Sequence, residues 1–91
     1  MILAVLVDLP ECNARSQRLK SVFDGACWAL DVEPEFVDVT SYDPRAGQVE
    51  TVPTVFVFDD ADPYGEPLAE HRGAFTAGQI TALLERGTAL V

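Results

Sequence analysis

Residues 49–58 read VETVPTVFVF, and the second half of this stretch predicts a buried β-strand over residues 54–58. An unbroken run of valine and phenylalanine is typical of a strand that is covered on both faces. Residues 2–7, which read ILAVLV, have the same character. We therefore expect both runs to lie in the interior of one sheet.

Between these two runs the sequence predicts a helix and then another strand. Asn13 is a plausible N-cap, Gly25 is a mild defect that would allow close packing on the sheet, and Pro34 discourages continuation of the helix. Residues 35–40 form the next strand, which is expected to run parallel to the first because the connection between them is long and helical. The helix is predicted from apolar residues that recur every 3.6 residues, at Leu19, Val22, Phe23, Ala26, Cys27 and Leu30.

The segment before the quoted stretch predicts a short second helix. Asp43 is placed as its N-cap and Pro44 as its first residue, with an end near Val49. After the quoted stretch, a loop rich in turn residues leads to a strand over residues 68–72, which gives a hairpin.

The C-terminal part predicts a last helix. Thr76 and Gln79 have the spacing of a capping box, and Gly87 is placed as the stop signal. The element order is then β-α-β-α-β-β-α in one α/β domain over residues 1–91, with a central mixed four-stranded sheet flanked by helices.

Charge and cysteine usage exclude several classes of function. The 15 acidic residues outnumber the 6 basic ones, which gives a net charge of −9. Such a surface repels nucleic acid and anionic membranes and favours a basic protein partner. Two cysteines are too few for a disulfide scaffold, and the first apolar run lacks the basic flank of a signal peptide. We expect a cytoplasmic protein with no membrane span, monomeric by default.

Three stretches in this order resemble the thioredoxin-like superfamily, which includes the thioredoxins and glutaredoxins. They are VDLPEC at residues 7–12, VETVPTVFVF at residues 49–58 and GAFTAGQITALL at residues 73–84. The resemblance covers almost the whole chain and implies a minimal thioredoxin fold, close in size to a glutaredoxin.

The resemblance implies that the Val52–Pro53 peptide bond is cis and that residues Thr51, Val52 and Pro53 bind substrate. A cis proline forces a turn that leaves the backbone groups of the preceding residue unpaired. Those groups could pair with an extended peptide as an added strand would.

The resemblance also places an atypical redox motif at Cys12-Asn13-Ala14-Arg15. Cys12 would be the nucleophile at a helix N-terminus, which lowers the pKa of a thiol. Arg15 occupies the position of the second cysteine and would stabilise the thiolate. Asp8 matches the buried acid that serves some thioredoxins as a proton relay. If the helix phase sets the alignment instead, Asn13 and Ser16 take the two cysteine positions.

Two functional hypotheses follow from these residues. The first is single-cysteine thiol–disulfide exchange on a peptide or glutathione mixed disulfide, with glutathione as co-substrate and no bound cofactor. The alternative is a redox-inactive adaptor module that binds protein, and a weaker option is a monothiol glutaredoxin. Cys27 lies on the core stripe and is interpreted as a buried hydrophobe. His71 has no His or Cys nearby in the sequence, so no metal site is expected.

Overall fold

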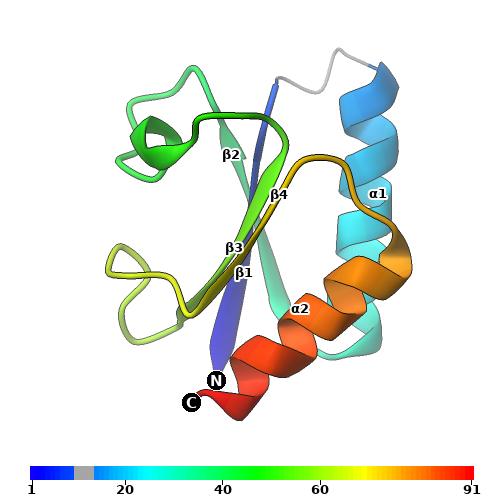
Figure 1. Ribbon diagram of the computed structural model, residues 1–91, viewed down its shortest axis with the longest axis vertical. Helices are drawn as coiled ribbons and strands as arrows, with labels where there is room; N and C mark the ends of the chain where they lie inside the picture. Colours follow the sequence, from blue (N-terminus) through cyan, green and yellow to red (C-terminus); the bar gives the residue numbers. More distant parts are fainter. Residues whose placement is uncertain (10–13) are drawn as a thin grey trace.

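The structure is a computed structural model that describes residues 1–9 and 14–91; Pro10, Glu11, Cys12 and Asn13 lie outside the described residues, and so does the predicted N-cap at Asn13. The described residues form one four-stranded sheet with the strand order β2-β1-β3-β4 (Figure 1). The elements are β1 (Ile2–Asp8), α1 (Ala14–Ala29), β2 (Glu33–Asp38), the 3-10 helix η1 (Ala46–Gln48), β3 (Thr54–Asp59), β4 (Ala69–Arg72) and α2 (Ala77–Ala89).

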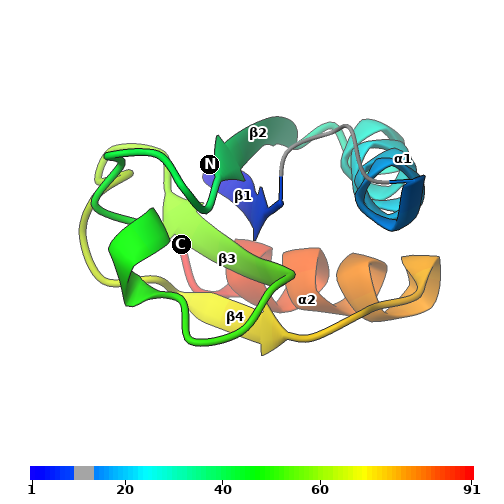
Figure 2. The same ribbon diagram turned by 90° about the horizontal axis from the view of Figure 1, so that it is seen from above.

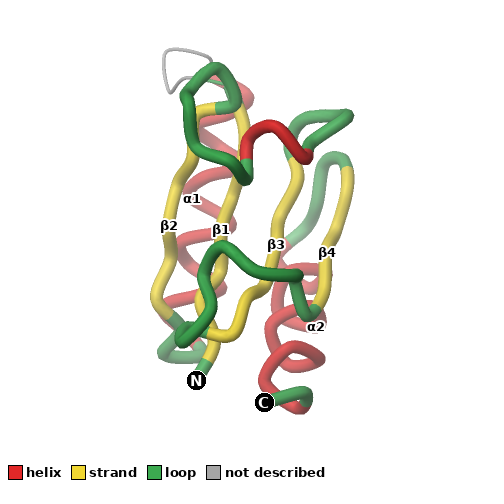
Figure 3. Tube along the Cα trace, turned by 90° about the vertical axis from the view of Figure 1, so that its left-hand side faces the viewer, coloured by secondary structure: helices red, strands yellow, loops and turns green. Residues whose placement is uncertain are grey.

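Strand β1 lies in the interior of the sheet, as its apolar sequence predicts. All seven of its residues are buried. It pairs with β2 in parallel and with β3 antiparallel, and β3 pairs antiparallel with β4 (Figure 3). The mixed sheet and the α/β class predicted from the sequence are therefore confirmed.

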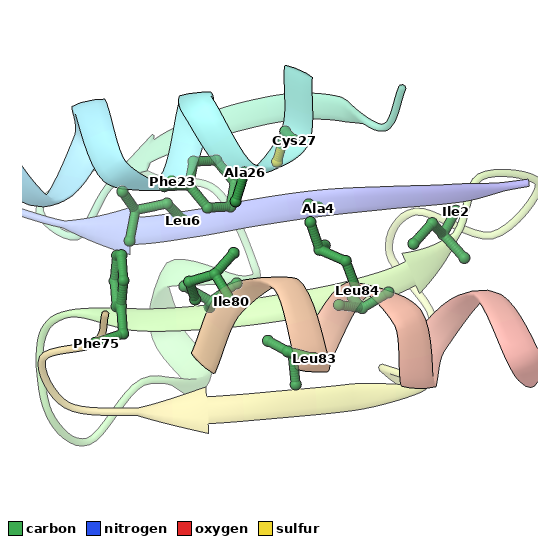
Figure 4. Close-up of a cluster of buried hydrophobic side chains, with 12 residues drawn as sticks. Ile2, Ala4, Leu6, Phe23, Ala26, Cys27, Phe75, Ile80, Leu83 and Leu84 are labelled. Atoms are coloured by element: carbon green, nitrogen blue, oxygen red, sulfur yellow. The ribbon is translucent and has the colours of Figure 1, made fainter. Parts of the chain in front are cut away.

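Both α-helices cover the same face of the sheet (Figure 2). The main core lies between them and the sheet, and its side chains come from β1, α1, β3 and α2 (Figure 4). A second cluster on the opposite face is centred on Val5, Val7, Phe56 and Phe58. No helix in the described part of the chain is long and apolar enough to cross a bilayer.

The opposite face is covered by irregular backbone and not by the predicted second helix. Only the 3-10 turn Ala46–Gln48 forms there. The predicted N-cap at Asp43 is replaced by Arg45, which makes no side-chain cap bond. Asp43 forms the turn before it: its Oδ1 accepts the Arg45 N–H at 2.9 Å and its carbonyl accepts the Ala46 N–H at 3.0 Å. The backbone is already extended at Val49, with φ −95° and ψ 123°. A segment this short cannot recover the cost of helix nucleation.

Helix α1 ends through a backbone motif at Asp31, before the chain reaches Pro34, which was expected to discourage its continuation. Asp31 has φ 55°, its N–H donates to the Trp28 carbonyl at 3.3 Å, and the Val32 N–H donates to the Cys27 carbonyl at 2.9 Å. These two bonds are those of a Schellman motif. Pro34 lies inside β2, which is an edge strand and so tolerates a residue without an N–H.

Two glycines have roles that differ from those predicted. Gly25 is exposed, and a Cβ at this position would meet no heavy atom within 4 Å, so it does not serve close packing. Gly87 does not stop α2, which continues to Ala89. It is buried against Val57, and an added Cβ would lie 2.4 Å from Val57 Cγ1. The close approach of helix and sheet therefore occurs in α2.

The N-terminus of α2 has the predicted capping box. The Thr76 hydroxyl accepts the Gln79 N–H at 3.3 Å, and the Gln79 side chain accepts the Thr76 N–H at 2.8 Å. Both bonds satisfy N–H groups that the helix itself leaves unpaired.

Candidate functional site

Three elements that carry predicted site residues meet at one end of the sheet. Strand β1 ends at Asp8, α1 begins at Ala14, and β3 begins at Thr54. Val7 pairs with Thr54, so the end of β1 lies beside the turn at residues 51–53. The end of β1 and the start of α1 lie at this end of the molecule (Figure 1), and Cys12 belongs to the sequence between them, outside the described residues.

Asp8 is a buried acid with one unused oxygen. The residue is only 2% exposed. Its Oδ1 accepts the Leu9 N–H at 2.8 Å, while its buried Oδ2 has no hydrogen-bond partner among the described residues. A buried carboxyl oxygen without a donor is costly. Asp8 is therefore a candidate for proton exchange with a group in the β1–α1 connection.

The turn at residues 51–53 presents free backbone groups. Its Val52–Pro53 peptide bond is cis. The Thr54 hydroxyl donates to the Thr51 carbonyl at 2.7 Å, and the Gly73 N–H donates to the Pro53 carbonyl at 2.8 Å. In the described part of the chain, neither the N–H nor the carbonyl of Val52 is hydrogen-bonded to another backbone group. An extended peptide could pair with both.

The residues in the first turn of α1 differ in burial, and this difference distinguishes between the two possible alignments of the redox motif. Ser16 is 3% exposed and lies on the same helix face as Phe23 and Cys27, whereas Arg15 is exposed. This helix phase agrees with the alignment that puts Asn13 and Ser16 at the two cysteine positions. Cys12 and Asn13 lie outside the described residues, so the role of Cys12 stays a prediction.

Cys27 cannot supply the missing second thiol. It lies near the C-terminal end of α1, 0% exposed within the main core. Burial, together with the charge of Asp24, raises the pKa of the Cys27 thiol to about 12. A thiol that stays protonated and buried is neither nucleophile nor metal ligand.

Solved thioredoxins share this arrangement of elements. A thioredoxin 1 from Thermosipho africanus superimposes with a TM-score of 0.70 at 17% identity, covering 96% of this chain and 94% of its own. Chloroplastic thioredoxin z gives 0.72 at 18% identity, covering 98% and 80%. A thioredoxin-2 described as a component of malaria parasite protein secretion machinery gives 0.72 at 12% identity, covering 94% and 82%.

The chain has the thioredoxin fold. No protein-family model and no curated protein matches its sequence. Identities of this size establish the shared fold and leave activity to be argued from the site itself.

A buried arginine that the sequence did not predict lies within this thioredoxin fold. Arg45 is 2% exposed and contacts Glu35 and both carboxylate oxygens of Asp43, at 3.0 and 2.8 Å for the latter. Its guanidinium lies 4.4 Å from the centre of the Tyr64 ring. The cluster holds residues 41–50 over the second face, directly before the turn at residues 51–53. Glu35 and Tyr64 are distant from Arg45 in the sequence, so only the local Asp43-Pro44-Arg45 turn could have indicated the cluster.

His71 contacts residues that follow it closely in the sequence. The His71 ring nitrogen Nε2 lies 3.2 Å from the Ala74 carbonyl, and the ring meets Phe75 edge-on. Among the described residues, no group of three or more His, Cys, Asp and Glu side chains is arranged to hold a metal ion.

Proposed function

We propose that this thioredoxin-fold protein carries out single-cysteine thiol–disulfide exchange at Cys12, on a peptide or glutathione mixed disulfide. Substrate binding is supported by Val52, whose N–H and carbonyl pair with no other backbone group among the described residues and lie beside the end of β1. A peptide paired there as an added strand would lie next to the β1–α1 connection, which carries Cys12.

The exchange needs one sulfur and an external thiol. The Cys12 thiolate attacks one sulfur of the mixed disulfide, a new S–S bond forms, and the other sulfur leaves as a thiolate. In reduction of a glutathione–peptide mixed disulfide, the attacked sulfur is that of glutathione, so the peptide leaves as a thiolate and Cys12 is joined to glutathione. A second glutathione thiolate then attacks the glutathione sulfur on Cys12, which releases the Cys12 thiolate and forms oxidised glutathione. Cys27 cannot take the place of glutathione, because it is buried and its pKa is raised to about 12.

Arg15 and Asp8 have distinct roles in this proposal. The guanidinium of Arg15, three residues after Cys12 in the sequence, would stabilise the thiolate and lower the pKa of the thiol. The Asp8 carboxyl, with Oδ2 unused among the described residues, would accept the Cys12 proton and return it to the leaving sulfur.

The first experiment measures glutathione-dependent reduction of a glutathione–peptide mixed disulfide. Cys12→Ser should abolish the reaction, and Cys27→Ala, which removes the other thiol, should leave it in place. Activity that survives in Cys12→Ser contradicts the proposal. A Cys12 pKa of ~8.5 or above in pH-dependent alkylation would also contradict the nucleophile role.

A second experiment separates the two supporting residues. Arg15→Ala should raise the pKa of Cys12. Asp8→Asn keeps an oxygen that can accept the Leu9 N–H, and it should change the pH profile of the exchange rate. An Asp8→Asn protein with the wild-type pH profile would show that Asp8 has a structural role only.

The second candidate function is a redox-inactive adaptor that binds a basic protein. It is favoured by the absence of a usable second thiol and by the net charge of −9. The Val52 backbone groups would bind a peptide in the same way with or without a sulfur at residue 12. Binding of a disulfide-free basic peptide that is unchanged in Cys12→Ser, together with no exchange activity, would favour the adaptor. Either function suits a reducing cytoplasm.

A further inference from the structure

The end of the sheet opposite Asp8 exposes large apolar side chains. Strand β1 runs between the two ends, and its seven residues span roughly 20 Å. At the far end lie the start of β1, the last turn of α1 and the chain ends (Figure 1). Met1 and Trp28 are each 82% exposed, and Leu90 is 59% exposed. Exposed aromatic and aliphatic side chains grouped in this way mark interaction surfaces.

Met1 and Trp28 border the first of three adjoining hollows that share lining residues, and we name these hollows together the terminal groove. A hollow of about 320 Å³ is lined by Met1, Trp28, Val32 and Pro34, together with Asp31 and Glu33. The next hollow shares Met1, Asp31 and Val32 with it and adds Leu30 and Thr88. A third shares Leu30 and Thr88 and reaches Ala89 and Glu85. The groove therefore runs from the β2 edge of the sheet to the last turn of α2.

The charged side chains that line the terminal groove are all acidic. Asp31, Glu33 and Glu85 contribute carboxylates, and no Lys, Arg or His is among the side chains that line it. Asp24, one helical turn before Trp28, already pairs with Lys20 at 3.1 Å. An apolar floor with acidic margins complements a segment that has apolar anchors flanked by lysine or arginine.

The groove is held in shape before anything binds. The Schellman motif fixes Trp28 and Asp31 relative to each other through the 3.3 Å bond between the Asp31 N–H and the Trp28 carbonyl. Val32 is fixed in turn by its bond to the Cys27 carbonyl at 2.9 Å. Such preorganisation reduces the entropy that binding must overcome.

We propose that the terminal groove is a second docking site, for a basic segment of a partner protein that inserts an apolar side chain beside Trp28. The site is distinct from the Val52 edge and needs no cysteine. A second copy of the chain is a poor occupant, because a two-fold contact would bring Asp31 and Glu33 of both copies together. Like charges also disfavour an anionic membrane.

Trp28 is the single tryptophan of the chain and so reports on the groove directly. The probe is a peptide of lysine, leucine and phenylalanine, which contains no tryptophan. The control is the same peptide with every lysine replaced by glutamate. The lysine peptide should shift Trp28 emission to the blue saturably, and added salt should weaken its binding. No shift, or an equal shift with the glutamate peptide, overturns the proposal. A shift that depends on protein concentration alone would assign the groove to a second copy and also overturn it.

Variants of the protein test whether the lysine peptide binds in the groove. The anisotropy of a labelled lysine peptide measures its affinity for each variant. Asp31→Asn with Glu33→Gln should weaken it about threefold to tenfold, and asparagine suits the positive φ of residue 31. Glu50→Gln with Glu70→Gln removes the same charge around Arg72 and should leave affinity unchanged. Trp28→Ala, at an exposed position, should weaken binding about tenfold or more. Equal losses in the two charge variants, or no loss in Trp28→Ala, would show non-specific attraction and overturn the proposal.

Discussion

Alanine at Gly87 should destabilise the protein, although alanine is the better helix former. The added Cβ would lie 2.4 Å from Val57 Cγ1 and 3.2 Å from Val57 Cβ. Val57 is 0% exposed in β3, an interior strand, so neither side can move away easily. Overpacking of this kind costs about 1–3 kcal/mol, and a contact this short belongs at the upper end. The gain in helix propensity is about 1 kcal/mol. We expect a net loss of about 2 kcal/mol.

The matched control is the same substitution at Gly25 in α1. A Cβ there would meet no heavy atom within 4 Å, and the residue is exposed. Only the propensity gain remains, so Gly25→Ala should stabilise the protein by about 0.5–1 kcal/mol. The two alanine variants therefore have opposite signs for one chemical change.

Urea unfolding followed by far-ultraviolet circular dichroism measures both variants. The midpoint should shift while the slope m stays constant. In a Val57→Ala background the cost of Gly87→Ala should fall, because the methyl group it collides with is gone. If the two glycine variants shift stability in the same direction, or if Val57→Ala leaves the cost of Gly87→Ala unchanged, the packing argument is refuted.

Three further predictions concern the buried polar groups and the caps. Arg45→Met should lower the free energy of unfolding by about 3 kcal/mol, because it leaves the carboxylates of Glu35 and Asp43 without their partner, although both retain some contact with water. Arg45→Lys, which keeps a positive charge, should lower it less. A wild-type urea midpoint in Arg45→Met would contradict this. Arg45 holds the pKa of Asp43 below its usual value. The stability that this ion pair contributes is therefore present above the unfolded pKa of ~3.9 and is lost as pH falls through the folded pKa. The stability of Arg45→Met should accordingly depend less on pH in the acid range. The Cys27 thiol, whose pKa is raised to about 12, should resist alkylation at pH 8 in a folded Cys12→Ser protein and should react fully when the protein is unfolded in urea. Equal alkylation rates in the folded and the unfolded protein would show that the thiol is accessible. Thr76→Ala should cost about 1 kcal/mol in urea unfolding through loss of the capping box, and Thr81→Ala is a control at a position outside the cap.

The strands β1 and β3 and the N-terminal end of α2 were predictable because their signals are local. The apolar runs of β1 and β3 and the capping box at Thr76 each depend on neighbouring residues only. The Schellman stop at Asp31 was missed because asparagine or glycine, and not aspartate, is the usual signal for a positive φ. The roles of Gly25 and Gly87 depend on which helix face meets the sheet, and composition does not reveal that.

The candidate site was predictable in part for the same reason. Asp8 stands at the end of an apolar run, and its burial follows from its place in an interior strand. The open backbone of Val52 could be anticipated only from the resemblance carried by residues 49–58. The Arg45 cluster could not be foreseen as a whole, because Glu35 and Tyr64 join it through tertiary contacts and only Asp43 is a neighbour in the sequence.

The cover of the second face has a consequence for how the molecule fluctuates. Residues 41–50 have little regular hydrogen bonding and are fastened mainly through the Arg45 side chain. Segments of this kind open at a lower free energy than the sheet beneath them. We expect their amide protons to exchange before those of β1 and β3. Because this segment leads straight into Thr51 and Val52, its transient opening would vary the path of an approaching peptide while Pro53, bonded to Gly73, stays in place.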